Sequence, residues 1–152
     1  WKEAEELEVQ VIELRKQVLG PEHPDTLTSM NNLASIYWNQ GRWKEAEELG
    51  VQVMELYKQI LGPEHPSTLT SMNNLAYTWK RLGKVQDALA LMEKCVELRR
   101  NLLGPEHPHS VSSSDTLRDW ERAVNSLSKN STQQTSAAIP PALPIHNNRP
   151  SR

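Results

Sequence analysis

Apolar residues recur along this chain with the spacing of amphipathic helices. In the stretch 1–19 they fall alternately three and four residues apart, and the same spacing returns in 43–61 and 85–103. Such spacing places apolar side chains on one helix face, so each stretch is predicted to be a helix that packs through that face. The predicted stripe residues are Ala4, Leu7, Val11, Leu14 and Val18, then Ala46, Leu49, Val53, Leu56 and Ile60, then Ala88, Leu91, Cys95, Leu98 and Leu102.

A second kind of helix is predicted between these stretches. It follows a proline, with Asp25 or Ser67 as the expected N-cap, and it ends at a glycine, Gly41 or Gly83. Glycine suits the tight turn into the next helix because it adopts positive φ without strain. The apolar residues of this second kind of helix are Leu27, Met30, Leu33, Ala34 and Tyr37, then Leu69, Met72, Leu75, Ala76 and Trp79.

The two kinds of helix belong to an internal repeat of 42 residues. The motif Gly-Pro-Glu-His-Pro occurs at 20–24, 62–66 and 104–108, and 15 of 19 positions are identical between 1–19 and 43–61. A helix pair of this kind cannot bury its apolar stripes alone, so successive pairs should stack on their neighbours. The sequence therefore predicts an all-α fold, a right-handed α-solenoid of antiparallel helix pairs.

The repeat also predicts how the chain is divided. We expect a repeat array over 1–127, followed by a disordered tail over 128–152 that is rich in Ser, Thr, Asn and Pro and contains no acidic residue. Trp1 is expected to be a cut point in a longer array. The parts of the array are a partial repeat at 1–19, full repeats at 20–61 and 62–103, and a degenerate capping helix at about 110–127.

Composition narrows the classes of partner and location. The formal net charge of -2 supplies no basic field for a phosphate backbone, so no nucleic acid partner is expected. No apolar run approaches the roughly 20 residues that cross a bilayer, so no membrane association is expected. A single cysteine, Cys95, cannot form an internal disulfide, which favours a reducing compartment and a cytoplasmic location.

The repeated unit resembles a tetratricopeptide (TPR) repeat of the 42-residue kind found in kinesin light chains and in the C-terminal arms of fungal NB-ARC or NACHT proteins. The resemblance implies a TPR-like solenoid that binds peptides or protein partners and has no catalysis of its own. Val85 departs from the family pattern, as do Arg118, Glu121 and Asn125 in the last copy, which is therefore expected to be a cap. The residues that carry the resemblance are Leu33, Ala34, Tyr37, Gly41, Trp43 and Ala46, repeated as Leu75, Ala76, Trp79, Gly83, Val85 and Ala88.

Polar residues lie opposite the apolar stripe of each post-proline helix, and in a TPR-like stack these helices line the concave side. Asparagine both donates and accepts hydrogen bonds, so it can hold the backbone of an extended peptide. Asn32 and Asn74 match positions where similar TPR proteins carry a peptide-holding asparagine. An alternative is that these asparagines are merely solvated or bond a neighbouring helix. The candidate groove residues are Thr28, Asn31, Asn32, Ser35 and Asn39, then Thr70, Asn73, Asn74, Tyr77 and Arg81.

Other signals predict structure rather than chemistry. His23, His65 and His107 recur, but stacked helices lie about 8–10 Å apart, too far for one metal ion to collect an imidazole from each loop. Cys95 falls in an apolar stripe and is expected to be a buried, inert thiol. No catalytic motif, metal site or cofactor site is predicted, so the chain is not expected to be an enzyme. The aromatic residues expected in the solenoid core are Tyr37, Trp43, Trp79 and Trp120.

Three functions remain open from the sequence. The first is a non-catalytic interaction module that holds a peptide or protein partner in the groove. The second is a sensor or regulatory arm of a larger NB-ARC or NACHT type of nucleotide-switched ATPase, whose P-loop would lie upstream. The third is self-association through the uncovered apolar stripe of the helix at 1–19.

Overall fold

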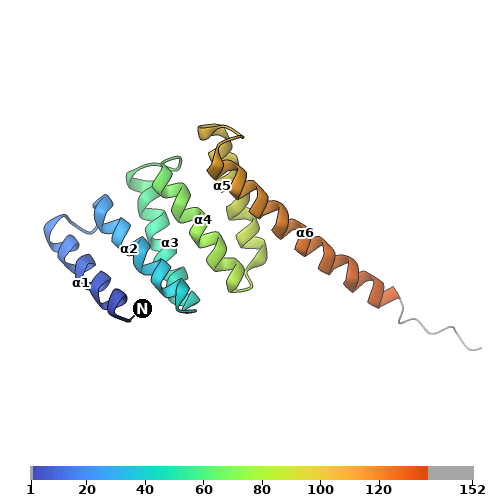
Figure 1. Cartoon of the computed structure of the whole chain (residues 1–152), viewed down its shortest axis with the longest axis horizontal. Coiled ribbons are helices and arrows are strands. Elements are labelled where there is room, and N and C mark those ends of the chain that lie inside the picture. Colours follow the sequence, from blue (N-terminus) through green and yellow to red (C-terminus); the bar gives the residue numbers. More distant parts are fainter. Residues whose placement is uncertain (1, 137–152) are drawn as a thin grey trace, which may run out of the picture.

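The computed structural model of the chain describes residues 2–136, with side chains described through residue 129. This part of the chain folds into helices that stack as antiparallel pairs in an α-solenoid, as predicted (Figure 1). No helix among the described residues is both long and apolar enough to cross a membrane. The helices are α1 (Lys2–Val18), α2 (Pro24–Asn39), α3 (Trp43–Ile60), α4 (Pro66–Arg81), α5 (Val85–Leu103) and α6 (Pro108–Ser136).

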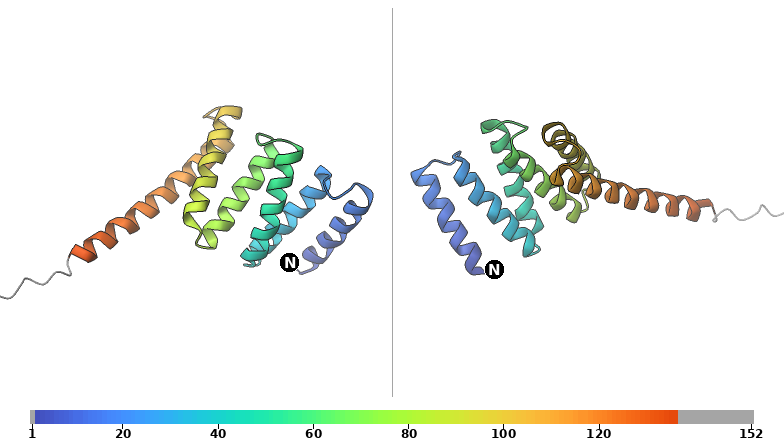
Figure 2. Two further views of the ribbon diagram at one scale, coloured as in Figure 1. Left: turned by 180° about the vertical axis from the view of Figure 1, so that it is seen from behind. Right: turned by 45° about the horizontal axis from the view of Figure 1, so that its top comes forward.

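The helices form two layers. In Figure 1 α2 and α4 lie in front of α3 and α5, and the view from behind in Figure 2 brings α1, α3 and α5 forward. Each helix packs against the helices next to it in sequence, and α2 also contacts α4. The post-proline helices therefore line one side of the array.

The core is divided along the array into three clusters. The first joins α1, α2 and α3, and the others lie between α3, α4, α5 and α6. Such a core is characteristic of repeat proteins, in which each unit contacts only its neighbours. The buried members are Ile12, Leu27, Met30, Leu33, Val53 and Tyr57, then Leu69, Met72 and Cys95, then Ala76, Ala88, Leu89, Met92, Val96 and Trp120.

The post-proline helices begin two residues earlier than the expected caps imply, and a different residue caps them. The expected caps, Asp25 and Ser67, lie inside the first turn, and His23 and His65 are the N-cap residues. Each imidazole accepts a hydrogen bond at Nδ1 from the backbone N–H two residues later, at 3.2 Å for His23 and 3.1 Å for His65. A proline follows each histidine at the first helical position, where its missing N–H costs nothing.

The same device opens α6, where the backbone N–H of His109 donates to Nδ1 of His107 at 3.2 Å. The recurring histidines therefore have a structural role in starting three helices. Among the described residues, no group of three or more His, Cys, Asp or Glu side chains is arranged to hold a metal ion.

The predicted glycine stops of α2 and α4 are confirmed. Gly41 has φ +76° and Gly83 has φ +78°. The N–H of Arg42 bonds the carbonyl of Tyr37 at 2.9 Å, and the N–H of Gly41 bonds that of Trp38 at 3.1 Å. This pair of bonds is a Schellman motif, which satisfies carbonyl groups at the helix end.

The predicted apolar stripes of α3 and α5 are correct in their first turns and wrong at their last position, whereas in α1 the stripe residues Leu7, Leu14 and Val18 are exposed and Ile12 is the buried residue. Ile60 is 38% exposed and Leu102 is 43% exposed, whereas Tyr57 and Arg99 are buried. The cause is the drift of a straight α-helix, which turns about 20° per seven residues away from a strict 3.5-residue repeat. After two such repeats the buried face has moved to the residue at 57 or 99.

Two further expectations differ from the structure. Trp43 was expected in the core but is 36% exposed, because it is the first residue of α3. The capping helix was expected to end near 127 and the disordered tail to begin at 128, whereas α6 continues to Ser136 and extends beyond the array in Figure 1. The remainder of the expected tail, 137–152, lies outside the described residues.

Candidate functional site

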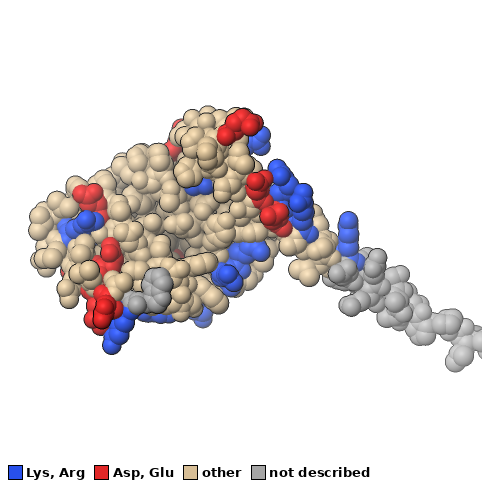
Figure 3. Space-filling view, viewed as in Figure 1, with Lys and Arg blue, Asp and Glu red and all other residues tan. Residues whose placement is uncertain are grey.

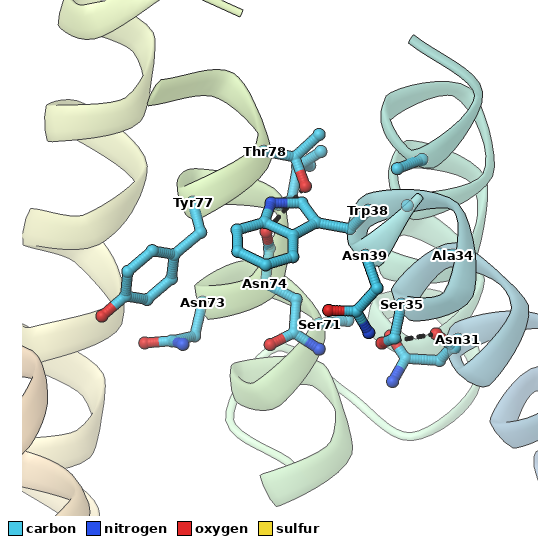
Figure 4. Close-up of a pocket in the computed structure, with 13 residues that line it drawn as sticks. Asn31, Ala34, Ser35, Trp38, Asn39, Ser71, Asn73, Asn74, Tyr77 and Thr78 are labelled. Atoms are coloured by element: carbon cyan, nitrogen blue, oxygen red, sulfur yellow. Dashed lines mark hydrogen bonds between the residues drawn. The ribbon is translucent and has the colours of Figure 1, made fainter. Parts of the chain in front are cut away.

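A cleft of about 310 Å³ opens between α2 and α4, with α3 as its floor. Figure 4 shows polar side chains of α2 and α4 on its two sides, with the Trp38 ring between the helices. In the view of Figure 3 the middle of this face, over α2 and α4, is largely free of charged side chains. The lining residues are Asn31, Ala34, Ser35, Trp38, Asn39, Ala46, Gly50, Ser71, Asn73, Asn74, Leu75, Tyr77 and Thr78.

The floor of the cleft exists because α3 carries small residues there. Ala46 and Gly50 lie one helical turn apart and both line the cleft. A Cβ atom added at Gly50 would lie 3.4 Å from Leu75 Cδ1, an ordinary contact. The residue one repeat later, Met92, is fully buried and fills the corresponding space against Trp120. The exchange of glycine for methionine explains why the cleft lies between α2 and α4.

The structure brings six of the ten predicted groove residues to the cleft. The four others, Thr28, Asn32, Thr70 and Arg81, lie outside its lining. The six in the cleft are Asn31, Ser35, Asn39, Asn73, Asn74 and Tyr77.

Thr28 and Arg81 have other contacts. The Thr28 hydroxyl donates to the carbonyl of Pro24 at 2.9 Å and lies 3.1 Å from the Tyr57 hydroxyl. The guanidinium of Arg81 lies 5.6 Å from the centroid of the Trp38 ring, a cation–π contact between neighbouring repeats. Asn32 and Thr70 are both exposed.

The α4 side of the cleft is held by the helices that follow it. The Tyr77 hydroxyl lies 3.0 Å from Thr116 Oγ1, and its ring meets Trp120 edge to face at 5.2 Å. Arg99 of α5 donates to Asn73 Oδ1 at 3.3 Å. These contacts restrict the side chains that α4 presents.

The side chains on the α2 side of the cleft have fewer contacts with neighbouring helices. The Ser35 hydroxyl donates to the carbonyl of Asn31 at 3.1 Å, within its own helix. Tyr57 occupies the place of Arg99 one repeat earlier, and its hydroxyl meets Thr28 rather than Asn31. The two asparagines at the same repeat position therefore have different surroundings.

Sequence reasoning missed Trp38 as a lining residue. The equivalent position in the next repeat is Lys80, so an aromatic residue does not recur there. Its Nε1 atom is buried and has no hydrogen-bond partner among the described residues. Trp38 directly follows the core residue Tyr37, so the pattern of helix faces alone could not identify it as a cleft residue.

The strongest electrostatic feature lies away from the cleft, where α1 meets the turn between α2 and α3. Arg42 bonds Glu5 at 2.8 Å and Glu45 at 2.5 Å, and its hydrogen bonds lower the pKa of both carboxyl groups. The pair Lys84–Glu47, at 2.5 Å, occupies the equivalent place one repeat later. These ion pairs join successive repeats.

The chemistry of the cleft is that of a binding surface. Its sides offer amide and hydroxyl groups, which both donate and accept hydrogen bonds, and its floor is apolar. Ligand sites in proteins commonly combine an apolar concavity with a few polar groups that fix orientation.

Comparison with known proteins supports this description. The tetratricopeptide repeat family model matches residues 1–25, 26–67 and 68–109. No curated protein matches the chain. Repeats of this family are scaffolds for protein–protein interaction and are typically non-catalytic.

Solved structures with the same fold include the nearly identical TPR-like repeats of a Podosopora anserina protein described as a kinesin light chain. That chain is 35% identical with a TM-score of 0.76, and the match covers 84% of this chain and 61% of that chain. A variant of the same protein is 34% identical with a TM-score of 0.70, covering 90% and 65%.

BtubC (BKLC) from P. vanneervenii is 16% identical with a TM-score of 0.63, covering 97% of this chain and 62% of that chain, and this likeness concerns the fold alone. The chain thus spans about three fifths of the length of these solved chains. The three family matches together cover most of the chain, and the structure has the helix pairs that they describe. The chain therefore belongs to the tetratricopeptide repeat family.

Proposed function

We propose that this chain is an interaction module that binds an extended segment of a partner protein in the cleft between α2 and α4. The observation that carries the proposal is the gathering of Asn31, Asn39, Asn73 and Asn74 around an apolar concavity. An extended backbone offers alternating N–H and C=O groups, and a carboxamide can pair with either. The apolar floor would take a side chain of the same segment.

The cleft favours a protein partner over a nucleic acid. None of its lining residues is charged, so it offers no cation to neutralise phosphate groups. The exposed groove residues outside the cleft, Asn32 and Thr70, extend the polar surface along α2 and α4. We place this function in the cytoplasm, since the single cysteine, Cys95, is a free and buried thiol.

The test uses two substitutions at Gly50 and a peptide selected from a random peptide library for binding to the unaltered chain. Gly50→Met introduces the side chain that the next repeat carries at this position, and it should fill the cleft. Gly50→Ala adds one methyl group and should leave the cleft open. We expect Gly50→Met to weaken binding by about tenfold or more, as the loss of a buried contact of ~1.4 kcal/mol or more would.

Circular dichroism and fluorescence anisotropy separate folding from binding in this test. Both variants should retain full helicity, because glycine inside a helix is less stable than either replacement. Unchanged affinity of a fully helical Gly50→Met variant would show that the peptide binds elsewhere. Asn74→Ala should also weaken binding, whereas Asn32→Ala, outside the lining, should weaken it less.

A second candidate function is self-association through α1. Leu7 is 62% exposed and Leu14 is 60% exposed, whereas their counterparts one repeat later, Leu49 and Leu56, pack against the core. An uncovered apolar face of this kind favours pairing with another apolar surface. We expect light scattering to show a mass that rises with concentration, and Leu7→Gln combined with Leu14→Gln to abolish the rise. A monomer at all micromolar concentrations would contradict this candidate.

A further inference from the structure

The outer face of α1 is apolar and open to solvent. Leu7 is 62% exposed, Leu14 is 60% exposed and Val18 is 77% exposed. At 100° per residue these three side chains lie within about 40° of one another around the helix, and Ile12, the buried residue of α1, lies about 120° or more from each of them. Figures 1 and 2 show α1 at the end of the array, beside α2. Within the described part of the chain, α1 therefore buries one apolar face and leaves a second one uncovered.

This outer face has the spacing of a coiled-coil seam. Its apolar residues follow one another by four, three and four residues, and the positions that flank such a seam determine how two helices pair. We call the four apolar residues together the α1 seam. The seam consists of Leu7, Val11, Leu14 and Val18, with Glu8 and Arg15 along one edge and Glu3, Gln10 and Gln17 along the other.

The two charges on the first edge of the seam are opposite in sign and available. Neither Glu8 nor Arg15 forms an ion pair with another described residue. Nη1 of Arg15 donates to the carbonyl of Asp25 at 2.7 Å and to Ser29 Oγ at 2.6 Å, and both acceptors are neutral. A guanidinium has five N–H donors, so the remaining ones can serve a carboxylate. Both charged residues occupy positions at which 1–19 differs from 43–61.

These edge charges favour one orientation for two copies of α1. A two-fold axis that makes two helices antiparallel brings the same edge of each together, so Glu8 of each copy meets Arg15 of the other. In this register Leu7 lies opposite Val18 of the second copy, so the two seams match. A parallel pair brings opposite edges together and places Glu3 beside Glu8 of the second copy, which sets two like charges against each other.

We infer that the self-association named above as a second candidate function is an antiparallel pairing of α1 with α1 of a second copy, held by the α1 seam and by two ion pairs between Glu8 and Arg15. In the next repeat α2 covers the equivalent stripe of α3 and runs antiparallel to it (Figure 1). The second copy of α1 takes the place and the direction that α2 has there. A two-fold contact of this kind closes at the dimer. This inference rests on the candidate self-association and is independent of the cleft.

Disulfide cross-linking tests the orientation. Cys95→Val introduces the residue at the same position of the previous repeat and removes the native thiol. In that background a chain with Gln10→Cys is mixed with a chain carrying Gln17→Cys in a glutathione redox buffer. An antiparallel pair places these two positions side by side on one edge, so we expect a disulfide-linked dimer with one chain of each kind. Val18→Cys alone should form no linked dimer, because Val18 meets itself only in a parallel pair.

A charge exchange tests the ion pairs. Glu8→Arg replaces both attractive pairs by repulsive ones, so we expect the dissociation constant of the dimer, measured by analytical ultracentrifugation, to rise about three- to tenfold. Glu8→Arg combined with Arg15→Glu restores both pairs and should recover the affinity, with circular dichroism verifying that each variant folds. The matched control is Glu3→Arg, which makes the same change of charge on the other edge and should have little effect.

The outcomes separate this inference from the candidate on which it rests. If the chain forms a dimer that depends on Leu7 and Leu14 but gives no mixed disulfide, or if Val18→Cys links to itself, self-association stands and the antiparallel arrangement is wrong. A mass that rises beyond the dimer shows an open, head-to-tail contact and also overturns it. A monomer at all micromolar concentrations removes both the candidate and this inference.

Discussion

The backbone N–H of Ser67 donates to Nδ1 of His65 across 3.1 Å, which makes a histidine the N-cap of α4. Histidine is not among the preferred N-cap residues, which are Ser, Thr, Asp and Asn. Here Pro66 follows at the first helical position, so the imidazole serves the next free N–H of the first turn. The same arrangement at His23 and His107 makes the cap a property of the repeat.

We predict that His65→Ala lowers the free energy of unfolding by about 1 kcal/mol, the usual cost of a lost N-cap. Urea unfolding followed by circular dichroism measures the change. Glu64→Ala, at the exposed neighbouring position, is the control and should have little effect. Equal stability of the two variants would contradict the capping role.

Two glycine substitutions should have opposite effects. Gly83 has φ +78°, so Gly83→Ala forces an alanine into the left-handed region and should destabilise the chain by about 1 kcal/mol. Gly50 lies inside α3 with no positive φ, so Gly50→Ala should stabilise it by about 0.5–1 kcal/mol. Thermal and urea unfolding of both variants provide the comparison, and a change of the same sign at both sites would refute it.

The ion-pair cluster at Arg42 predicts how stability depends on pH. Hydrogen bonds from Arg42 lower the folded-state pKa of Glu5 and of Glu45 from the ordinary value of 4.5. A lowered pKa contributes stability that is present above about pH 4.5 and lost as the pH falls through the lower folded-state values. Arg42→Gln should therefore lose less stability than the unaltered chain between about pH 7 and about pH 3. Urea midpoints at both pH values test this, with Arg118→Gln as an exposed control; parallel acid losses in Arg42→Gln and the unaltered chain would count against it.

Burial predicts low reactivity for Cys95. The residue is fully buried, its Sγ lies 3.4 Å from the carbonyl of Leu69, and burial raises the pKa of its thiol, with Arg99 opposing the rise. The thiolate is the reactive form, so a disulfide-exchange reagent should modify the folded chain far more slowly than the chain in urea. Similar rates in the two conditions would mean that the interface between α4 and α5 opens readily.

The 42-residue period made the helix order predictable, because apolar spacing and glycine stops are local signals. The face that α3 and α5 bury was predictable only for their first turns, and the buried residue of α1, Ile12, was not among the predicted stripe residues. Ile60 fits a strict alternation of three and four residues, but the real helix turns 100° per residue, which brings Tyr57 to the core instead. A helical wheel drawn at 100° per residue, instead of a strict alternation of three and four residues, places Tyr57 on the buried face.

The candidate site was partly predictable for a related reason. The polar faces of α2 and α4 follow from helix geometry, which is why residues such as Asn74 were found. The location of the cleft depends on Gly50 and its counterpart Met92, and volume across an interface cannot be derived from the pattern of a single helix. Trp38 and Arg99 were missed because each acts through a contact between repeats.

The glycine of α3 and the methionine of α5 occupy one repeat position with opposite results. At Gly50 the space remains open as the cleft, whereas at Met92 the side chain fills the space and is buried in the core. Duplication of this unit therefore preserves the packing of the helices without preserving the cleft. The residue at this one repeat position determines whether the junction between two repeats is open or filled.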